Sequence, residues 1–259
     1  MSITFPNIDP IMFEIGFLKV HWYSMAYIAG FMATYFYFLR VIKKDGFNFL
    51  SLKAVDSLLN HGILGIILGG RIGYTLFYNF SYYSTNYMEI IKIWKGGMSF
   101  HGAVIGLIIS IFLFSRKNKI SYLYIFDIIA SIAPLGIFLG RIANFINAEL
   151  YGRVTDVSWG VVFPNSDGLP RHPSQLYEAF FEGLLLLIII NLLRLSQRIL
   201  RKHGFLTGVF CIGYSLSRFF IEYYREPDIQ LGFILNNITM GQILTLPLFV
   251  IGIILLIRK

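Results

Sequence analysis

The residues best suited to chemistry lie in the segment Gly140–Gly152, which reads Gly-Arg-Ile-Ala-Asn-Phe-Ile-Asn-Ala-Glu-Leu-Tyr-Gly. The apolar run Tyr122–Leu139 directly precedes it. A lone arginine at such a place can simply extend toward a membrane surface. Asparagine and glutamate cannot, so clustered polar groups at the end of an apolar run predict a functional site. The polar residues are Arg141, Asn144, Asn147 and Glu149. An arginine with amide and carboxylate neighbours is suited to binding an anion such as a phosphate.

A second charged group ends another apolar run, in the segment Arg218-Phe-Phe-Ile-Glu-Tyr-Tyr-Arg225. Arg218 and Glu222 are four residues apart, and Glu222 and Arg225 are three apart, so all three side chains can share one face of a helix. Such a face is either a ladder of mutually neutralising charges or an anion site. The spacing leaves both interpretations open.

Arg71 lies inside an apolar run and directly follows Gly70. We expect its side chain to point into a helix bundle, where it pairs with a carboxylate or meets an anionic ligand. The neighbouring glycines favour close packing between helices. They are Gly65, Gly69, Gly70 and Gly73, with Gly102/Gly106 and Gly136/Gly140 at the same four-residue spacing further along.

His101 follows the segment Gly96-Gly-Met-Ser-Phe, and Ser99 is placed to cap a helix that begins there. In the first turn, the positive end of the helix dipole disfavours the imidazolium form. The histidine is either a hydrogen-bonded structural residue or a neutral base that can accept a proton near neutral pH.

The composition describes the protein that must position these groups. Of 259 residues, 56% are hydrophobic and only 14% are charged, and the mean hydropathy is +0.66. These values indicate an all-α polytopic membrane protein and exclude an ordinary soluble domain. The net charge of +8 does not indicate nucleic-acid binding, because the basic residues fall in short groups between apolar runs. The single cysteine, Cys211, lies in an apolar run and is expected to be a buried, inert thiol.

A hydrocarbon core about 30 Å thick needs roughly 20 apolar residues per helix. Seven runs meet this requirement, and we expect one transmembrane domain, residues 1–259, with no removable signal peptide. The runs are Val20–Leu39, Ala54–Tyr78, Met98–Phe114, Tyr122–Leu139, Gln175–Leu193, Phe205–Tyr223 and Thr239–Ile257. Two long insertions are expected on the same side, an arm at residues 79–97 and a small head region at residues 140–174.

Lysine and arginine gather in the connections after the first, third and fifth runs and at the C-terminus. By the positive-inside rule these segments are cytoplasmic, so the N-terminus, the arm and the head face outward. The polar segment Gly140–Gly152 is then expected at the outer leaflet. A cysteine at Asn118 should react from the cytoplasmic side, and one at Asn165 from outside.

The motif Gly140-Arg-x-Ala-Asn-Phe-x-Asn-x-Glu-x-x-Gly152 resembles the signature of the prolipoprotein diacylglyceryl transferases, bacterial enzymes that lipidate lipoprotein precursors. The resemblance extends over nearly the full chain. It continues through His21-Trp-Tyr23, Gly69-Gly-Arg-Ile-Gly73, Gly97-Met-Ser-Phe-His-Gly102, Arg171-His-Pro-Ser-Gln-Leu-Tyr-Glu178, Arg218 with Glu222, and Met240-Gly-Gln242. One departure is a short Val154–Arg171 insertion, which bears on the size of the head.

The resemblance implies transfer of a diacylglyceryl group from phosphatidylglycerol to a cysteine thiol in the lipobox of a prolipoprotein signal peptide, at the bacterial inner membrane, with release of glycerol phosphate. It implies no cofactor, and the chain offers no cluster of metal ligands. The matching essential positions are Tyr23, His101, Arg141, Asn144, Glu149, Gly152, Arg218 and Glu222. We predict catalytic roles for Tyr23, His101, Arg141 and Arg218, and lipid contacts by Arg71, Arg141, Asn144, Asn147, Glu149, Gly152, Glu222 and Arg225.

These assignments are consistent with the chemistry. A weakly acidic thiol needs a base or a positive field, and His101 is the candidate base. Charge on the phosphate grows as the carbon–oxygen bond breaks, so fixed arginines bind the transition state better than the ground state. Asn144 and Glu149 are expected to orient the headgroup and an arginine, Glu222 to hold Arg218, and Gly152 to allow a tight turn.

A transporter for a small anion is the alternative, since its site also holds arginines near glycine-interrupted helices. The sequence has no convincing internal repeat, and its polar groups lie toward one membrane face. A structural scaffold is a third interpretation, and it leaves His101, Arg141 and Arg218 on the outer side without a role.

Overall fold

The computed structural model describes residues 2–6, 8–16, 18–44, 52–164, 166–227, 233–235 and 238–258. The chain divides into two compact units, one of residues 35–125 and the other of residues 1–34 with 126–259. The boundaries between the units fall within two helices, α1 (Trp22–Lys44) and α5 (Tyr122–Ile146). The expected single transmembrane domain therefore stays a prediction.

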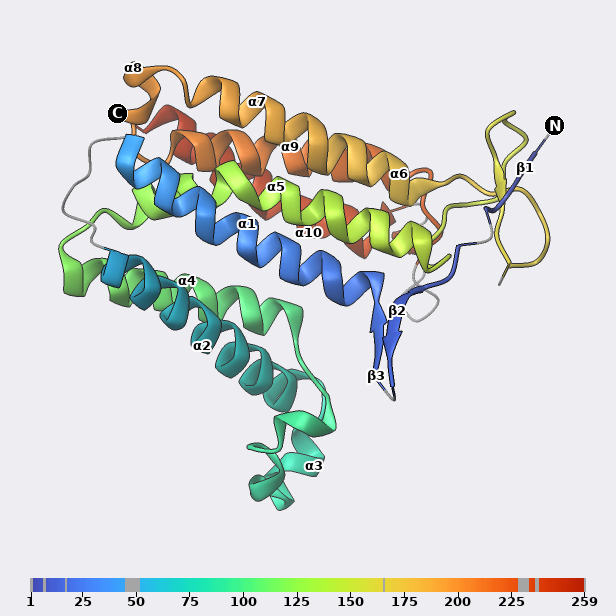
Figure 1. Cartoon of the computed structure of the whole chain (residues 1–259), viewed down its shortest axis with the longest axis horizontal. Coiled ribbons are helices and arrows are strands. Elements are labelled where there is room, and N and C mark those ends of the chain that lie inside the picture. Colours follow the sequence, from blue (N-terminus) through green and yellow to red (C-terminus); the bar gives the residue numbers. More distant parts are fainter. Residues whose placement is uncertain are drawn as a thin grey trace. The chain divides into compact units, whose positions relative to one another are not determined.

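The unit of residues 35–125 contains two long helices that run side by side, α2 (Leu52–Phe77) and α4 (Phe100–Asn118) (Figure 1). The segment that joins them is the arm expected at residues 79–97. It consists of three short helical pieces: α3 (Phe80–Thr85), η1 (Tyr87–Glu89) and η2 (Ile93–Lys95).

Glycines form the contact between α2 and α4, as their spacing predicts. A Cβ atom on Gly69 would lie 2.3 Å from the carbonyl oxygen of Gly102, and one on Gly106 would lie 2.0 Å from that of Gly65. No other residue fits at these positions without separating the backbones. The close-packing interpretation is confirmed for these glycines. It is wrong for Gly136 and Gly140 on α5, where an added Cβ atom would meet nothing within 4 Å.

The other unit contains the remaining long helices. The helix expected over Gln175–Leu193 is continuous but changes its winding, because a π-helical segment separates two α-helical ones. π-Helical turns are rare in proteins, and those that occur are often at functional sites. The three parts are α6 (Ser174–Glu178), η3 (Ala179–Leu185) and α7 (Leu186–Leu193), and they are followed by α8 (Gln197–Leu200), α9 (Phe205–Ile221) and α10 (Met240–Ile257).

The helices α9 and α10 pack along each other, and a buried carboxylate fixes the start of α9. Asp127 on α5 accepts hydrogen bonds from the backbone nitrogens of Gly204 and Thr207, at 2.7 and 2.8 Å. These nitrogens belong to the helix start, where backbone donors lack partners within the helix. The contact sets the position of α9 against α5.

The described residues contain three short strand pairs, one of which involves the head, and the head has a small apolar core. β1 (Ile3–Thr4) pairs in parallel with β4 (Val161–Val162), while β2 (Ile11–Ile15) with β3 (Leu18–His21) and β5 (Phe233–Leu235) with β6 (Ile238–Thr239) form antiparallel pairs. The core of the head consists of Ala148, Val161 and Phe163, with Phe5, Phe145 and Tyr151 packed against it.

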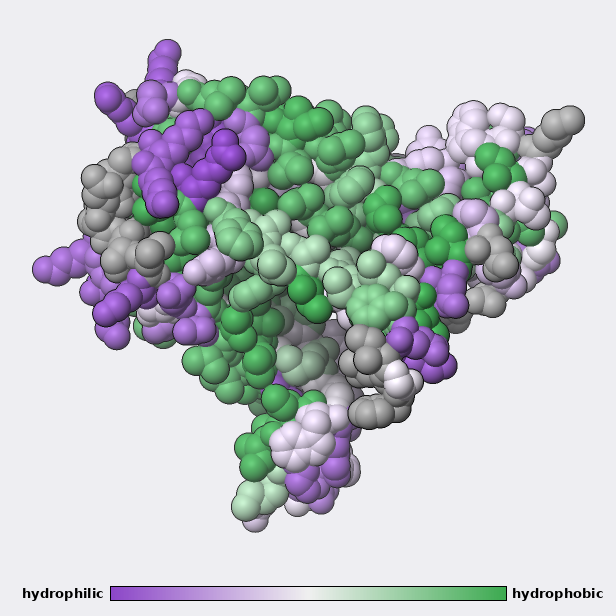
Figure 2. Space-filling view, in the orientation of Figure 1, coloured by the Kyte–Doolittle hydropathy of each residue, from purple (hydrophilic) through white to green (hydrophobic). Residues whose placement is uncertain are grey.

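In the part of the chain that the structure describes, five helices are long and apolar enough to cross a membrane: Trp22–Lys44, Phe100–Asn118, Tyr122–Ile146, Ser174–Leu193 and Met240–Ile257. Large apolar side chains on them are exposed, for example Tyr27 and Leu192, as expected for lipid-facing surfaces. Figure 2 shows apolar residues along α7 and hydrophilic residues gathered around α8. The expected helical, polytopic membrane protein is confirmed. The count of seven spans stays a prediction, with α2 and the shorter apolar α9 as the other two candidates.

Candidate active site

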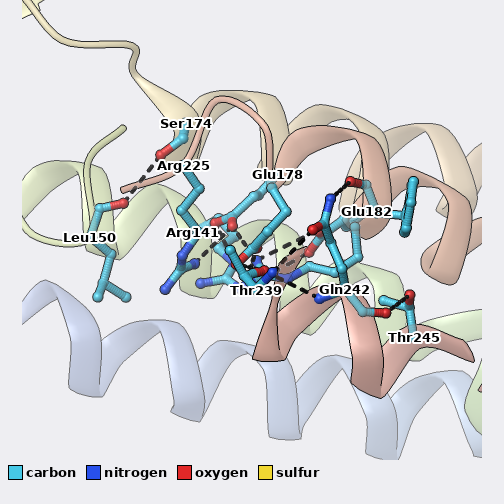
Figure 3. Close-up of polar contacts among 12 residues, drawn as sticks. Arg141, Leu150, Ser174, Glu178, Glu182, Arg225, Thr239, Gln242 and Thr245 are labelled. Atoms are coloured by element: carbon cyan, nitrogen blue, oxygen red, sulfur yellow. Dashed lines mark hydrogen bonds and ion pairs between the residues drawn. The ribbon is translucent and has the colours of Figure 1, made fainter. Parts of the chain in front are cut away.

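The centre of the site is Glu178, a fully buried carboxylate on α6 that three arginines contact (Figure 3). Arg141 Nε on α5 lies 3.0 Å from Glu178 Oε2. Arg225 Nη1 donates to Glu178 Oε1 at 2.8 Å, and Arg218 Nη1 on α9 donates to the same oxygen. One carboxylate thereby holds guanidinium groups from the helices α5 and α9 and from the segment after α9.

A second carboxylate, Glu222, holds Arg218 from the other side. Its Oε2 atom lies 2.9 Å from Arg218 Nη2, and its Oε1 atom accepts a hydrogen bond from Thr239 Oγ1 at 2.9 Å. A Cβ atom on Gly241 would lie 2.8 Å from Glu222 Oε1, so the glycine makes room for this carboxylate at the start of α10. The expectation that Glu222 holds Arg218 agrees with this geometry.

A third carboxylate, Glu182, lies on the π-helical segment η3 and is also fully buried. It is 3.9 Å from both Arg141 Nη2 and Arg218 Nη1. We call Arg141, Arg218, Arg225, Glu178, Glu182 and Glu222 the arginine–glutamate cluster. Arg218 pairs with Glu222 four residues further along, as the spacing predicts, whereas Arg225 pairs with Glu178 on α6. Whether this face is a charge ladder or an anion site stays open.

The polar end of α5 continues the cluster toward the head. Arg141 Nη1 donates to Asn144 Oδ1 at 3.4 Å, and Asn144 Nδ2 donates to Glu149 Oε1 at 2.8 Å. Asn147 Nδ2 donates to the same glutamate oxygen at 3.3 Å. The structure therefore brings all four polar residues of the sequence motif into one chain of hydrogen bonds.

An unusual backbone turns Glu149 back onto α5. Ala148 and Leu150 on either side of it have positive φ angles of 52° and 57°, a conformation that is uncommon for residues other than glycine. Residues at the start of α6 support this turn: Gln175 Nε2 donates to the Glu149 carbonyl at 2.7 Å, and Ser174 Oγ donates to the Leu150 carbonyl at 3.2 Å. Such strain is maintained where the surrounding structure over-determines it, often at functional sites.

A cavity of about 470 Å³ opens beside this turn. It is lined by His21, Tyr23 and Ser24 at the start of α1 and by Asn147 and Glu149 after α5. The Tyr23 hydroxyl lies 3.0 Å from that of Tyr27. Tyr23, which lies far from Glu149 in the sequence, is thus on the same cavity, and its polar lining is suited to a hydrophilic headgroup.

Gly152 permits a close approach of chain segments. A Cβ atom there would lie 2.4 Å from the carbonyl oxygen of Tyr224 and 2.7 Å from that of His172. Its backbone nitrogen donates to the latter carbonyl at 2.8 Å. Its φ angle is not positive, so the close approach of these segments, and not a left-handed backbone, requires a glycine here. The expected tight turn stays a prediction. The contacts of Gly152 bring the head against the end of α9.

The head carries two titratable groups with shifted pKa values. The Arg171 guanidinium donates to both oxygens of Asp167 and lowers the pKa of that carboxyl group. Burial lowers the pKa of His172, whose Nδ1 atom lies 3.2 Å from the Tyr177 hydroxyl. His172 is therefore neutral at neutral pH and acts as a packing and hydrogen-bonding residue of the head.

Arg71 binds the arm. Its guanidinium is buried and donates to the backbone carbonyls of five residues at 2.5 to 3.3 Å, and it lies 5.1 Å from the centre of the Tyr83 ring. The carbonyls belong to Glu89, Ile90, Lys92, Gly96 and Gly97. The sequence suggested a carboxylate or an anion as the partner, whereas the structure supplies neutral carbonyls. A lipid contact by Arg71 stays a prediction.

His101 lies in the first turn of α4, and its side chain is exposed. Ser99 caps this helix as expected, because its Oγ atom accepts a hydrogen bond from the backbone nitrogen of Gly102 at 3.1 Å. His101 belongs to the unit of residues 35–125, and Arg141 to the other unit. Its function as a base next to the arginines stays a prediction.

Glu178 and Glu182 have the most central positions, and sequence reasoning missed both. Glu178 ends the motif that begins at Arg171, and Glu182 lies beyond it. A signal was present, since two glutamates four residues apart interrupt the apolar run Gln175–Leu193. Carboxylates inside an apolar membrane helix mark a functional site and require partners. Among the described residues, no group of histidine, cysteine or acidic side chains is arranged to hold a metal ion.

Comparison with known proteins identifies the family. The sequence profile of the prolipoprotein diacylglyceryl transferases matches residues 10–258. A protein of Rickettsia felis named phosphatidylglycerol–prolipoprotein diacylglyceryl transferase is 52% identical over 250 residues, which is 96% of each chain. The proteins with this name from Rickettsia typhi and Rickettsia bellii are 51% identical over 253 residues (98% of this chain and 97% of the relative) and 50% identical over 256 residues (99% and 97%). The chain belongs to the prolipoprotein diacylglyceryl transferase family.

Proposed function

We infer that this chain transfers the diacylglyceryl group of phosphatidylglycerol to prolipoproteins in a bacterial membrane. Relatives that it matches over nearly their full length are named for this activity. The observation that carries the chemistry is the convergence of Arg141 and Arg218, from two helices, on the buried Glu178. Guanidinium groups held in this way are positioned before the substrate arrives.

The acceptor in this proposal is the thiol of the lipobox cysteine in the signal peptide. Its sulfur attacks the carbon of the diacylglyceryl group that is bonded to the phosphate oxygen. That carbon–oxygen bond breaks, and a thioether and glycerol phosphate form. The thiol proton passes to a base. The nucleophile belongs to the substrate, which agrees with the buried position of Cys211, the enzyme's own cysteine.

Arg141 and Arg218 stabilise the phosphate as it leaves. A phosphodiester carries one negative charge, and the departing monoester carries nearly two, so the charge increases along the reaction. Fixed guanidinium groups bind the more highly charged state more strongly, which lowers the barrier. Glu178 and Glu222 hold the two arginines in place, and a preorganised fork loses little entropy when it binds.

The cavity lined by Tyr23, Asn147 and Glu149 receives the headgroup glycerol. Its hydroxyl groups are donors and acceptors, and the lining offers a phenol, an amide and a carboxylate as partners. His101 accepts the thiol proton in this scheme. Its support is chemical, since imidazole is the side chain that most often serves as a general base near neutral pH.

The catalytic face of the enzyme is outside the cytoplasm in this proposal. The N-terminus is outside and the C-terminus is cytoplasmic. The support comes from the basic residues that follow the first, third and fifth apolar runs, because such residues remain on the cytoplasmic side of bacterial membranes. The lipobox of an exported precursor reaches the same side.

A reconstituted assay tests the function. Purified protein is given phosphatidylglycerol and a lipobox peptide, without added metal or nucleotide. We expect a thioether-linked diacylglyceryl peptide and glycerol phosphate in equal amounts, and no product from a peptide with serine in place of cysteine. Movement of an anion across liposomes with no peptide modification would instead support the transporter.

Arg141→Lys tests the role of the guanidinium in the same assay. The variant keeps the charge but loses the planar fork, so we expect turnover to fall by about 100-fold, the usual cost of removing one transition-state donor. Lipid binding should fall much less. Arg116→Lys, an exposed substitution at the end of α4, is the matched control. Weaker lipid binding with normal turnover at saturating lipid would show that Arg141 binds the substrate but does not stabilise the transition state.

A further inference from the structure

Glu178 and Glu182 are a matched pair with different surroundings. They lie four residues apart on one continuous helix, and neither side chain is exposed. Glu178 accepts hydrogen bonds from Arg218 and Arg225. Within the described part of the chain, neither side-chain oxygen of Glu182 has a hydrogen-bond partner.

The charges that face Glu182 come from several elements. Arg141 on α5 and Arg218 on α9 each lie 3.9 Å away, but both are closer to Glu178, which is itself a repelling neighbour of Glu182. Arg225, after α9, also binds Glu178, and Tyr214 of α9 is a neighbour without charge. The helix α10 contains no charged residue.

A buried carboxylate without hydrogen bonds is strongly disfavoured, and such a group takes up a proton instead. The charge balance of the cluster points the same way. The guanidinium groups of Arg141, Arg218 and Arg225 carry three positive charges, and Glu178 and Glu222 carry two negative ones. An ionised Glu182 would cancel the remaining positive charge, whereas a neutral Glu182 leaves it for a phosphate.

We propose that Glu182 is a charge-setting residue that holds a proton, so that the arginine–glutamate cluster keeps the net positive charge that a phosphodiester monoanion requires. The inference rests on the proposed function, since the phosphate is that of phosphatidylglycerol. Glu182 acts through the arginines and is a positioning residue. The surplus charge exists only while Glu182 is protonated, so the affinity for the lipid falls as the pH rises through its titration.

The test measures the dissociation constant of phosphatidylglycerol in detergent micelles as a function of pH, without peptide. For the wild type, the constant should rise by up to tenfold per pH unit on the alkaline side, as expected for one coupled proton. In Glu182→Gln the side chain is neutral at every pH, so this rise should disappear. The matched variant Glu178→Gln removes the charge that holds three arginines and should weaken binding at every pH.

If Glu182→Gln binds the lipid more tightly than the wild type by the same factor at every pH, Glu182 is ionised throughout and the proposal is wrong. An infrared measurement tests the proton without any substrate. The wild type should show the carbonyl stretch of a protonated carboxyl group, shifted in heavy water and absent from Glu182→Gln. Absence of that band from a folded wild type overturns the proposal, even if the transferase reaction itself is confirmed. If Glu182→Gln does not fold, the infrared band and the pH dependence of binding of the wild type still test the proposal.

Discussion

The hydroxyl group of Thr239 joins the start of α10 to Glu222 on α9. Thr239 Oγ1 donates to Glu222 Oε1 at 2.9 Å and accepts a hydrogen bond from the backbone nitrogen of Gln242 at 3.4 Å. The Gln242 side chain returns the contact by accepting from the Thr239 nitrogen, which completes a capping box. A helix cap thereby supports the carboxylate that holds Arg218.

Thr239→Val should destabilise the protein and lower its activity. The change removes an N-cap, which costs about 1 kcal/mol, and leaves one oxygen of buried Glu222 without its donor. The melting temperature in detergent and the transfer rate measure the two effects. Thr245→Val is the control, since its hydroxyl donates to a backbone carbonyl on the same helix and does not touch Glu222. Equal losses of activity in both variants would show that the hydrogen bond from Thr239 to Glu222 does not support the site.

Gly152→Ala should impair folding of the head or abolish transfer. The added methyl group would meet the Tyr224 carbonyl at 2.4 Å and the backbone of His172 at 2.7 Å, and neither backbone can move aside easily. Yield of folded protein and turnover are the readouts. At Gly136 on α5 a Cβ atom meets nothing within 4 Å, so Gly136→Ala is expected to be tolerated. Normal turnover of Gly152→Ala would contradict the close-approach explanation.

Arg71→Lys should loosen the arm. One ammonium group cannot replace a guanidinium that donates to five carbonyls, so the backbone of residues 87–97 loses its common anchor. We expect faster hydrogen exchange there than in the wild type. Lys95→Met removes only a half-exposed ion pair with Glu89 and should change the exchange much less. Unchanged exchange in Arg71→Lys would mean that other contacts hold the arm.

The orientation is tested by cysteine labelling in a Cys211→Ala background. Cys211 is buried in α9, so we expect its removal to leave transfer intact. Asn165 lies outside the described residues, and exposed Ser158 represents the head in its place. A cysteine at Asn118 should react only from the cytoplasmic side, and one at Ser158 only from outside. Reversed labelling would place the head on the cytoplasmic side and would contradict the proposed site at the outer leaflet.

The sequence by itself determined the features that depend on local periodicity. Long apolar runs have one stable solution in lipid, which is a helix, so the membrane class and the approximate position of the main helices followed from composition. Two extents were wrong, because α1 and α5 continue past their expected ends at Leu39 and Leu139, to Lys44 and Ile146. The pairing of Arg218 with Glu222 followed from their four-residue spacing. The cap at Ser99 and the glycine contact between α2 and α4 are local or regularly spaced in the same way.

Only the tertiary structure decided which partners meet across the chain. Arg141 and Arg218 are far apart in the sequence, and nothing in their spacing indicates that both contact Glu178. The sequence likewise placed Arg71 in a bundle without revealing that arm carbonyls are its partners. Periodicity fixes the face on which a side chain lies, whereas its partner depends on how helices pack and on where a π-helical turn rotates that face. For this reason the two buried glutamates were visible in the sequence, but their different surroundings were not.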